Sequence, residues 1–229
     1  MGIRSTVVNA GIGLLFRLFC TISDRDLRKL PLHGPAILIS NHTSNLEGPL
    51  FYVRLRPRNT IAMAKSELWS FFATRMIMEA WDAIPIRRGR LDRKALRRCA
   101  QVLERGDFLC IAPEGKRSKD GALLRGQAGA TWFAADKPIP IYPMVQWGCR
   151  DILSDLVHLR RPRITIRVGR PFLVRTPASG PSDAPHHDSD VRQAMADEMM
   201  YQIAENVPPE YRGYYADSSL KTTHYLEFV

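Results

Sequence analysis

Short apolar runs alternate with longer segments of helical periodicity along most of the chain. Runs with the length and composition of buried strands fall at residues 36–40, 61–64, 83–86, 108–112, 139–146 and 163–168. Helical spacing, or a helix start signal, marks residues 66–72, 91–105, 127–135 and 191–206. Strands that alternate with helices predict an α/β fold, with a central mostly parallel or mixed sheet flanked by helices.

Residues 1–30 are expected to form an N-terminal amphipathic helical segment. Asn9 and Arg17 interrupt its apolar stretch, and a spanning helix needs about 20 apolar residues. A helix here would place on one face Val8, Ile12, Leu15, Phe16, Phe19 and Ile22. Such a face beside basic residues is typical of a helix in the membrane interface. A terminal helix packed on the protein's own core shows the same periodicity, so both interpretations stay open.

The rest of the chain divides into a predicted α/β core at residues 31–175 and a C-terminal part at residues 176–229. Residues 176–190 are rich in Pro, Ser, Gly, Asp and His, which is typical of a linker or surface loop. His186, His187 and Asp188 lie in this stretch and are interpreted as loop residues, not as metal ligands. One amphipathic helix follows, and the pattern does not place residues 207–229.

The charge of the chain points to anionic partners. The chain has 33 Lys and Arg against 23 Asp and Glu, a formal net charge of +10, and is 45% hydrophobic. Such a composition argues against general disorder, and the charge suits nucleic acid, an anionic membrane or a phosphate-bearing molecule. No zinc-finger, helix-turn-helix or RNP-like pattern is visible, which disfavours nucleic acid. The four cysteines are widely spaced without a CxxC pair, which favours reduced thiols over a zinc site.

The first motif with catalytic potential follows the strand predicted at residues 36–40. Asn41 and His42 open a tight turn, and Glu47 stands five positions beyond the histidine. A carboxylate can orient an imidazole through one ring nitrogen and stabilise its cationic form. The other nitrogen then stays free to take a proton from a hydroxyl. A helix-capping histidine beside a surface glutamate is the alternative.

Three further motifs also occur at or in predicted strands. The strand at residues 108–112 leads into Pro113, Glu114, Gly115, Lys116, Arg117 and Ser118. Glycine permits close backbone approach, and an arginine fork suits a phosphate, although a charged surface turn has the same composition. Pro85 and the arginines after Ile86 follow another strand, and Pro143 lies inside the strand at residues 139–146.

Together these motifs resemble the four blocks of the glycerolipid acyltransferase family, which includes the bacterial 1-acylglycerol-3-phosphate acyltransferases. The blocks are a His-x4-Asp motif, a Pro-x-x-Arg motif, Pro-Glu-Gly-x-Arg-Ser, and a strand with a proline. Here they correspond to Asn41–Glu47, Pro85–Arg88, Pro113–Ser118 and Pro143. The resemblance covers roughly residues 30–170. The sequence departs from the pattern in one place, because Glu47 stands where the family has aspartate.

The resemblance implies catalytic roles for His42 and Glu47, with His42 as the general base. It implies substrate-binding roles for Asn41, Lys65, Arg88, Glu114, Gly115, Lys116, Arg117, Ser118 and Pro143. The implied reaction moves a fatty acyl group from acyl-CoA or acyl carrier protein to a lysophospholipid hydroxyl, with lysophosphatidic acid as the default acceptor. The acyl donor is a substrate, and no cofactor or metal is implied. The expected location is peripheral, on the anionic cytoplasmic face of a membrane, with no nucleic acid partner.

The glutamate adds a methylene group and would move the carboxylate by about 1.5 Å on an unchanged backbone. A shift of this size can cost about 10²-fold in activity if nothing compensates for it. A catalytically silent lipid- or acyl-CoA-binding relative is therefore the main alternative. A serine hydrolase is disfavoured because the sequence contains no G-x-S-x-G motif.

Overall fold

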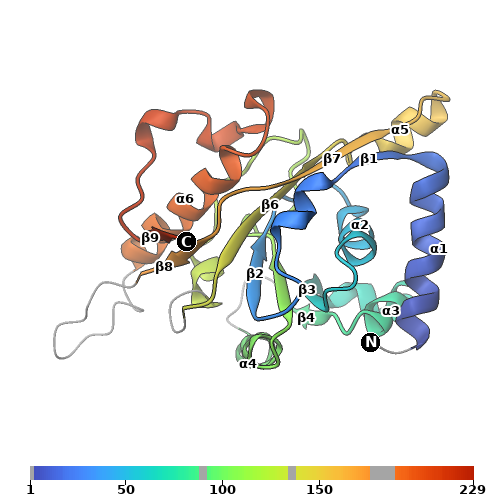
Figure 1. Cartoon of the computed structure of the whole chain (residues 1–229), viewed down its shortest axis with the longest axis horizontal. Coiled ribbons are helices and arrows are strands. Elements are labelled where there is room, and N and C mark those ends of the chain that lie inside the picture. Colours follow the sequence, from blue (N-terminus) through green and yellow to red (C-terminus); the bar gives the residue numbers. More distant parts are fainter. Residues whose placement is uncertain (1–2, 88–91, 134–137, 176–188) are drawn as a thin grey trace.

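The computed structural model describes residues 3–87, 92–133, 138–175 and 189–229, and shows a mixed α/β fold (Figure 1). Nine strands of this described part form one sheet. They are β1 (Thr21–Ser23), β2 (Ala36–Ile39), β3 (Thr60–Lys65), β4 (Ile84–Ile86), β5 (Phe108–Ile111), β6 (Ile141–Trp147), β7 (Arg163–Val168), β8 (Phe172–Val174) and β9 (Leu226–Phe228). The predicted strands are all present, and β1, β8 and β9 are additional.

The strand order is β1-β7-β6-β2-β5-β3-β4, and β8 pairs with β6 and β9. The neighbours β6, β2, β5, β3 and β4 are all parallel, whereas β7 and β8 run antiparallel to β6. The sheet is therefore mostly parallel but mixed, as predicted. Because parallel strands point the same way, the loops that follow β2, β3, β4 and β5 all emerge at one edge of the sheet.

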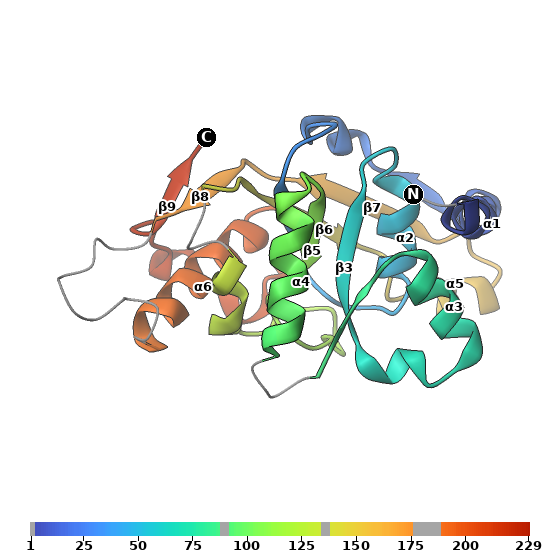
Figure 2. The ribbon, with the colours of Figure 1, turned by 90° about the horizontal axis from the view of Figure 1, so that it is seen from below.

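Helices cover both faces of the sheet, as Figures 1 and 2 show. The α-helices are α1 (Ile3–Phe19), α2 (Glu47–Arg54), α3 (Phe72–Ala80), α4 (Arg93–Glu104), α5 (Ile152–Val157) and α6 (Ser189–Ala204). Successive β2 side chains alternate between two cores. Ile37 and Ile39 pack in the core shared with α4 and α6. Ala36 and Leu38 pack in the core shared with α1 and α2. Burial on both faces explains why β2 is a continuous apolar run.

The N-terminal helix is present, and the apolar face predicted for it is partly right, because Phe16 is buried and Val8 and Ile12 are half-buried. Leu15 and Phe19 are 56% and 49% exposed, and Ile22 lies beyond the helix in β1. The buried side of α1 carries Ser5 and Asn9 as well as Phe16. The Asn9 Oδ1 accepts a hydrogen bond from the buried Trp81 indole N–H at 2.8 Å. This bond provides a partner for the Oδ1 of a polar side chain that is buried among apolar groups.

The outer side of α1 is apolar and exposed. Val7, Leu14 and Leu18 are 66%, 56% and 58% exposed. The neighbouring helix α3, which contacts α1, exposes Phe72 to 79%, and Phe71 just before it is 71% exposed. Both helices lie at the end of the molecule away from α6 (Figure 1). Among the described helices, none is long and apolar enough to cross a membrane.

Two further expectations need correction. The spacing of residues 127–135 predicts an α-helix, but the described part of this stretch is a 3₁₀-helix over Ala128–Phe133. The expected helix at residues 66–72 is a 3₁₀-helix over Ser66–Trp69, and α3 begins only at Phe72. The stretch at residues 127–135 contains Gly129, and glycine disfavours a helix interior. The predicted linker, with His186, His187 and Asp188, lies almost wholly outside the described residues.

The C-terminal residues that the pattern left unplaced form short 3₁₀-helices over Pro209–Tyr211, Gly213–Tyr215 and Ser218–Leu220, followed by β9. The four cysteines are free thiols, and all are buried. Burial raises the pKa of the Cys110 thiol to about 12. A buried, protonated thiol is inert, which agrees with the expected structural role of these cysteines.

Candidate active site

The loop after β2 is attached to β6 by Asn41. The Asn41 side-chain amide donates to the Gln146 carbonyl at 2.8 Å, and its Oδ1 accepts from the Gln146 N–H at 2.9 Å. Asn41 is 2% exposed. Its side chain therefore continues the pairing of β2 with β6 past the end of β2, and this fixes where His42 leaves the sheet.

The side chains of His42 and Glu47 are in direct contact. The His42 Nδ1 lies 2.6 Å from the Glu47 Oε2. The Glu47 side chain is 4% exposed, whereas the His42 side chain is 26% exposed. No described residue hydrogen bonds to the other ring nitrogen, Nε2, so this atom is accessible to a substrate. This geometry is that of a general base oriented by a carboxylate.

The turn accommodates the longer side chain of Glu47. Glu47 is the first residue of α2, and its other oxygen, Oε1, accepts hydrogen bonds from upstream groups. These are the Thr43 N–H at 2.5 Å, the Thr43 hydroxyl at 2.7 Å and the Ser44 N–H at 2.8 Å. The Gln146 side-chain amide donates to the same oxygen at 2.6 Å. Contacts to both oxygens fix the orientation of the carboxylate.

Glu114 connects the loop after β5 to His42. One of its oxygens accepts from the His42 backbone N–H, and the other from the Leu124 N–H, both at 2.8 Å. The Ser118 N–H donates to the His42 carbonyl, also at 2.8 Å. Burial raises the pKa of the Glu114 carboxyl to about 7, against the pull of these two hydrogen bonds and of His42. Glu114 and Ser118 are thus buried and hold the backbone of His42 on both sides.

The remaining predicted site residues lie around this edge of the sheet. Gly115, Lys116 and Arg117 are exposed on the loop after β5, and Lys65 is exposed at the end of β3. A positive φ of 69° at Gly115 favours glycine there. Arg88 lies outside the described residues, and its neighbour Arg87 ends the described stretch after β4.

Pro143 lies in the middle of β6, directly opposite Ile39. At this point β6 changes its antiparallel partner from β8 to β7. The Pro143 carbonyl accepts from the Gly169 N–H in the connection between those two strands. The Pro143 nitrogen faces the place where β8 ends and β7 begins to pair with β6. No described strand offers a hydrogen-bond acceptor for an N–H there, so a proline is tolerated inside this central strand.

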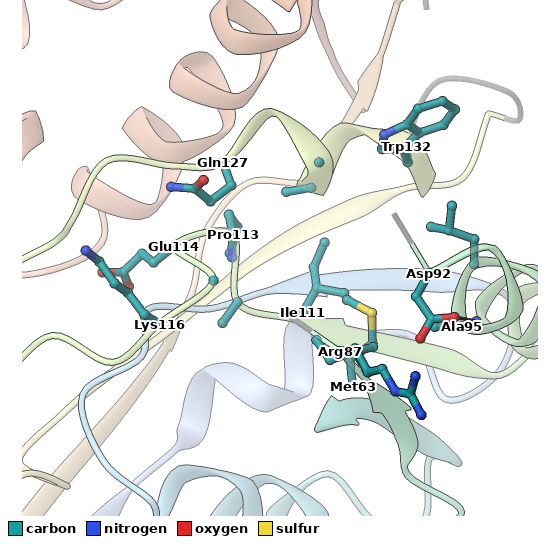
Figure 3. A pocket seen from close by; sticks show the side chains of 16 residues that line it. Met63, Arg87, Asp92, Ala95, Ile111, Pro113, Glu114, Lys116, Gln127 and Trp132 are labelled. Carbon is teal, nitrogen blue, oxygen red and sulfur yellow. Dashed lines mark hydrogen bonds between the residues drawn. The ribbon is translucent and has the colours of Figure 1, made fainter. Parts of the chain in front are cut away.

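A cavity of about 740 Å³ opens between α4, the 3₁₀-helix over Ala128–Phe133 and the ends of β3, β4 and β5. Its lining reaches the catalytic loop at Glu114, which accepts the His42 backbone N–H, and does not include His42 or Glu47. Its apolar lining includes Met63, Ile111 and Trp132, and its polar lining includes Glu114 and Lys116. Figure 3 shows Lys116 and Glu114 at one end and Asp92 and Ala95 at the other. An apolar volume with a cation at one end suits a molecule with a long apolar part and an anionic group.

Several of these contacts have no signature in the sequence. Gln146, which touches Glu47, is 99 positions away from it in the chain. Leu124 contributes only a backbone N–H, which no side-chain pattern reveals. Trp132 and Met63 line the cavity because of the fold, and their residue types alone would equally suit a core.

The fold and this site define an α/β protein with a carboxylate-oriented histidine at the carboxyl edge of its sheet. The family model described as acyltransferase matches residues 21–147. The chain therefore belongs to the acyltransferase family, as the sequence motifs predicted.

Several curated proteins are similar to the chain. A chloroplastic 1-acyl-sn-glycerol-3-phosphate acyltransferase of Arabidopsis thaliana is 28% identical over 59% of this chain and 38% of its own length. The 1-acyl-sn-glycerol-3-phosphate acyltransferase alpha of Mus musculus is 29% identical over 75% of this chain and 61% of its own length. The crystal structure of the 1-acyl-sn-glycerophosphate acyltransferase PlsC from Thermotoga maritima matches with a TM-score of 0.61. That match is 19% identical over 85% of this chain and 76% of the other chain, and shows a common fold.

Proposed function

We propose that the protein transfers a fatty acyl group from a thioester, acyl-CoA or acyl carrier protein, to the hydroxyl of a lysophosphatidic acid-type acceptor. The 2.6 Å contact between His42 Nδ1 and Glu47 Oε2 carries this proposal, because it leaves the Nε2 nitrogen available as a base. The names of the relatives supply the substrate class. The chain spans 38% to 61% of the length of the two relatives described above.

The reaction follows from the geometry. The His42 Nε2 takes the proton of the acceptor hydroxyl while its oxygen attacks the thioester carbonyl carbon. The tetrahedral intermediate then releases the thiolate, which takes the proton from the His42 imidazolium, so the products are an ester and a free thiol. Glu47 stabilises the imidazolium in between. General-base catalysis of this kind raises the rate by about 10²–10⁴-fold. Binding the two substrates in the correct relative orientation lowers the activation barrier by about 7–11 kcal/mol more.

The cations on the loop after β5 are assigned to the acceptor's phosphate. Lys116 and Arg117 are exposed on this loop, and Lys116 lines the end of the cavity that Glu114 also lines. Arg88 and Lys65 complete the proposed set of phosphate anchors. A cation at the cavity mouth leaves the apolar lining to acyl chains. Proton transfer by His42 requires no metal, so the proposed reaction includes neither a metal nor another cofactor.

We expect thiol release to depend on His42. Acyl-CoA and acyl carrier protein are each supplied with a panel of lyso-lipids, and the new ester is identified by mass spectrometry. His42→Ala should abolish the reaction. His158→Ala is the matched control, because that histidine is exposed and its Nδ1 contacts the Ser154 carbonyl of its own helix, away from the catalytic loop. Binding of lipid without any thiol release would favour the catalytically silent relative instead.

The outer side of α1 supports a peripheral contact with an anionic membrane. Leu14 and Leu18 are exposed together, and the basic Arg4 and Arg17 lie on the same helix. Anionic headgroups attract each nearby Lys or Arg by about 1 kcal/mol. Replacement of both leucines by serine should weaken co-sedimentation with phosphatidylglycerol vesicles. Leu220→Ser, an exposed leucine of the C-terminal part, is the control. Equal binding by all variants would contradict the assignment.

A further inference from the structure

A short stretch of backbone, residues 123–126, lies between the catalytic loop and the C-terminal part of the chain. On one side, the Leu124 N–H donates to the Glu114 Oε2 at 2.8 Å. On the other side, the Gly126 N–H donates to the Tyr215 hydroxyl at 2.9 Å. Glu114 in turn accepts the backbone N–H of His42. Hydrogen bonds and the short backbone of residues 124–126 therefore connect Tyr215 to the histidine.

Both backbone groups of Gly126 are bound by C-terminal side chains. The Tyr215 hydroxyl accepts from its N–H, and the Gln193 side-chain amide donates to its carbonyl at 3.0 Å. The Tyr215 hydroxyl also donates to the Asp197 Oδ1 at 2.5 Å, and Gln193 donates to the same oxygen at 3.1 Å. Tyr215 is 2% exposed. A buried network whose members are bound to one another is rigid and specifies one arrangement.

The same stretch is also fixed sterically and at Leu123. A Cβ at Gly126 would lie 2.6 Å from the Met200 side chain of α6, so the backbone approaches this helix too closely for any larger residue. The Leu123 N–H donates to the Tyr211 carbonyl at 2.8 Å, and its carbonyl accepts from the Tyr214 N–H at 2.9 Å. The C-terminal part thus sets the position of the whole stretch that presents the Leu124 N–H.

We propose that the C-terminal part is a positioning element of the acyl-transfer site, in which Tyr215 and Asp197 are positioning residues. They fix the Leu124 N–H, which fixes the Glu114 carboxylate, which fixes the backbone of His42. This inference rests on the proposed function and extends it to residues outside the matched region 21–147. A misplacement of about 1 Å at a reacting group can cost about 10²-fold in rate, so an indirect support can control kcat.

The chain offers a matched control. Tyr201 belongs to the same buried group, and its ring contacts that of Tyr215 edge-to-face at 5.0 Å. Its hydroxyl donates to the Asp217 carbonyl and not to residues 123–126. Tyr215→Phe and Tyr201→Phe therefore each remove one buried hydroxyl from one cluster, and only the first change affects the stretch that holds Glu114.

The experiment compares both variants by thermal unfolding, steady-state kinetics and amide hydrogen exchange of residues 113–127. Tyr215→Phe should lower kcat about 10- to 100-fold, leave KM nearly unchanged and speed exchange at Leu124. Tyr201→Phe should lower the unfolding temperature without either effect. Asp197→Asn, which keeps an acceptor for Tyr215, should retain most of the kcat that Asp197→Ala loses.

Equal kcat losses in the two tyrosine variants, or unchanged exchange at Leu124 in Tyr215→Phe, would overturn the proposal. The exchange measurement needs no substrate. Wild-type protein that fails to release thiol with any acceptor refutes the proposed function. In that case, fast exchange at Leu124 in Tyr215→Phe alone still supports the positioning role, and unchanged exchange still refutes it.

Discussion

The Gln146 side-chain amide donates to the Glu47 Oε1 at 2.6 Å, and this contact joins β6 to the catalytic turn. Gln146 is fully buried, and its amide also lies 3.0 Å from the Thr43 hydroxyl. The histidine's partner is therefore held by a strand as well as by its own turn. A strand is a firmer support than a loop, because its backbone is fixed by the sheet.

Loss of this amide should reduce turnover. Gln146→Leu keeps the approximate volume but removes a charge-assisted hydrogen bond of about 1.5–3 kcal/mol, so we expect kcat to fall about 10- to 100-fold. Gln202→Leu is the matched control, since Gln202 is also a buried glutamine, but lies on α6. Steady-state kinetics measure the kcat of both variants, and we expect a loss only in Gln146→Leu. A kcat loss common to both would assign the effect to general destabilisation.

The charge of Glu47 should matter more than its length. In Glu47→Gln, an amide replaces the carboxylate and no longer stabilises the imidazolium, so we expect a loss of at least about 10²-fold in kcat. Glu47→Asp restores the charge and the residue that the family motif carries, and should be less impaired. Both are measured by thiol release. A glutamine variant with full activity would show that the pair is not catalytic.

The raised pKa of Glu114 predicts how stability depends on pH. Its pKa is about 7 in the folded protein against an ordinary value of 4.5, because burial disfavours the charged form. The fold thus prefers the protonated carboxyl. This stabilisation is complete below pH 4.5 and is lost as the pH rises through about 7, by at most about 1.4 kcal/mol per pH unit.

Glu114→Gln removes this titration. The free energy of unfolding of the wild type, relative to that of the variant, should fall between pH 5 and pH 7.5, and denaturant unfolding across this range measures it. His42 and Glu47 also act on the Glu114 carboxyl by their charges, so each should be replaced in a parallel series to separate their electrostatic effect from that of burial. A pH-independent difference between wild type and Glu114→Gln would contradict the assignment.

The exposed cations of the loop after β5 should act on acceptor binding. We expect Lys116→Gln and Arg117→Gln each to raise the KM for a phosphate-bearing lyso-lipid about tenfold, the value of one charge-assisted hydrogen bond of about 1.5 kcal/mol. A lyso-lipid without the phosphate should show no such change. Lys119→Gln, on the same loop and also exposed, is the control. If the two substitutions raised the KM equally for both lyso-lipids, Lys116 and Arg117 would not bind the phosphate.

The strands β2 and β5 could be predicted from sequence because each is an apolar run buried on both faces, as Leu38 and Ile39 of β2 are. The pair of His42 and Glu47 could be predicted because five positions across one turn bring the two side chains together. The contact of Gln146 with Glu47, which supports the pair, could not be predicted from sequence. Gln146 reaches Glu47 only after β6 has paired with β2, and a sequence without an alignment gives no register for that pairing.

The errors have physical causes as well. Hydrophobicity alone misses part of the buried face of α1, because Asn9 is buried against Trp81, which lies far along the chain and supplies an indole N–H. The C-terminal residues show no periodicity because β9 has only three residues and pairs with β8 at the margin of the sheet. In both places, distant contacts outweigh the local pattern.

The exposed leucines of α1, Leu14 and Leu18, have a consequence for how the rate is measured. An enzyme held on a bilayer by such a helix meets its lipid in two dimensions, so the relevant concentration is the mole fraction of acceptor in the surface. Diluting the acceptor with inert lipid at constant bulk concentration should then slow the reaction. Adding more vesicles of unchanged composition, once all enzyme is bound, should leave the rate the same.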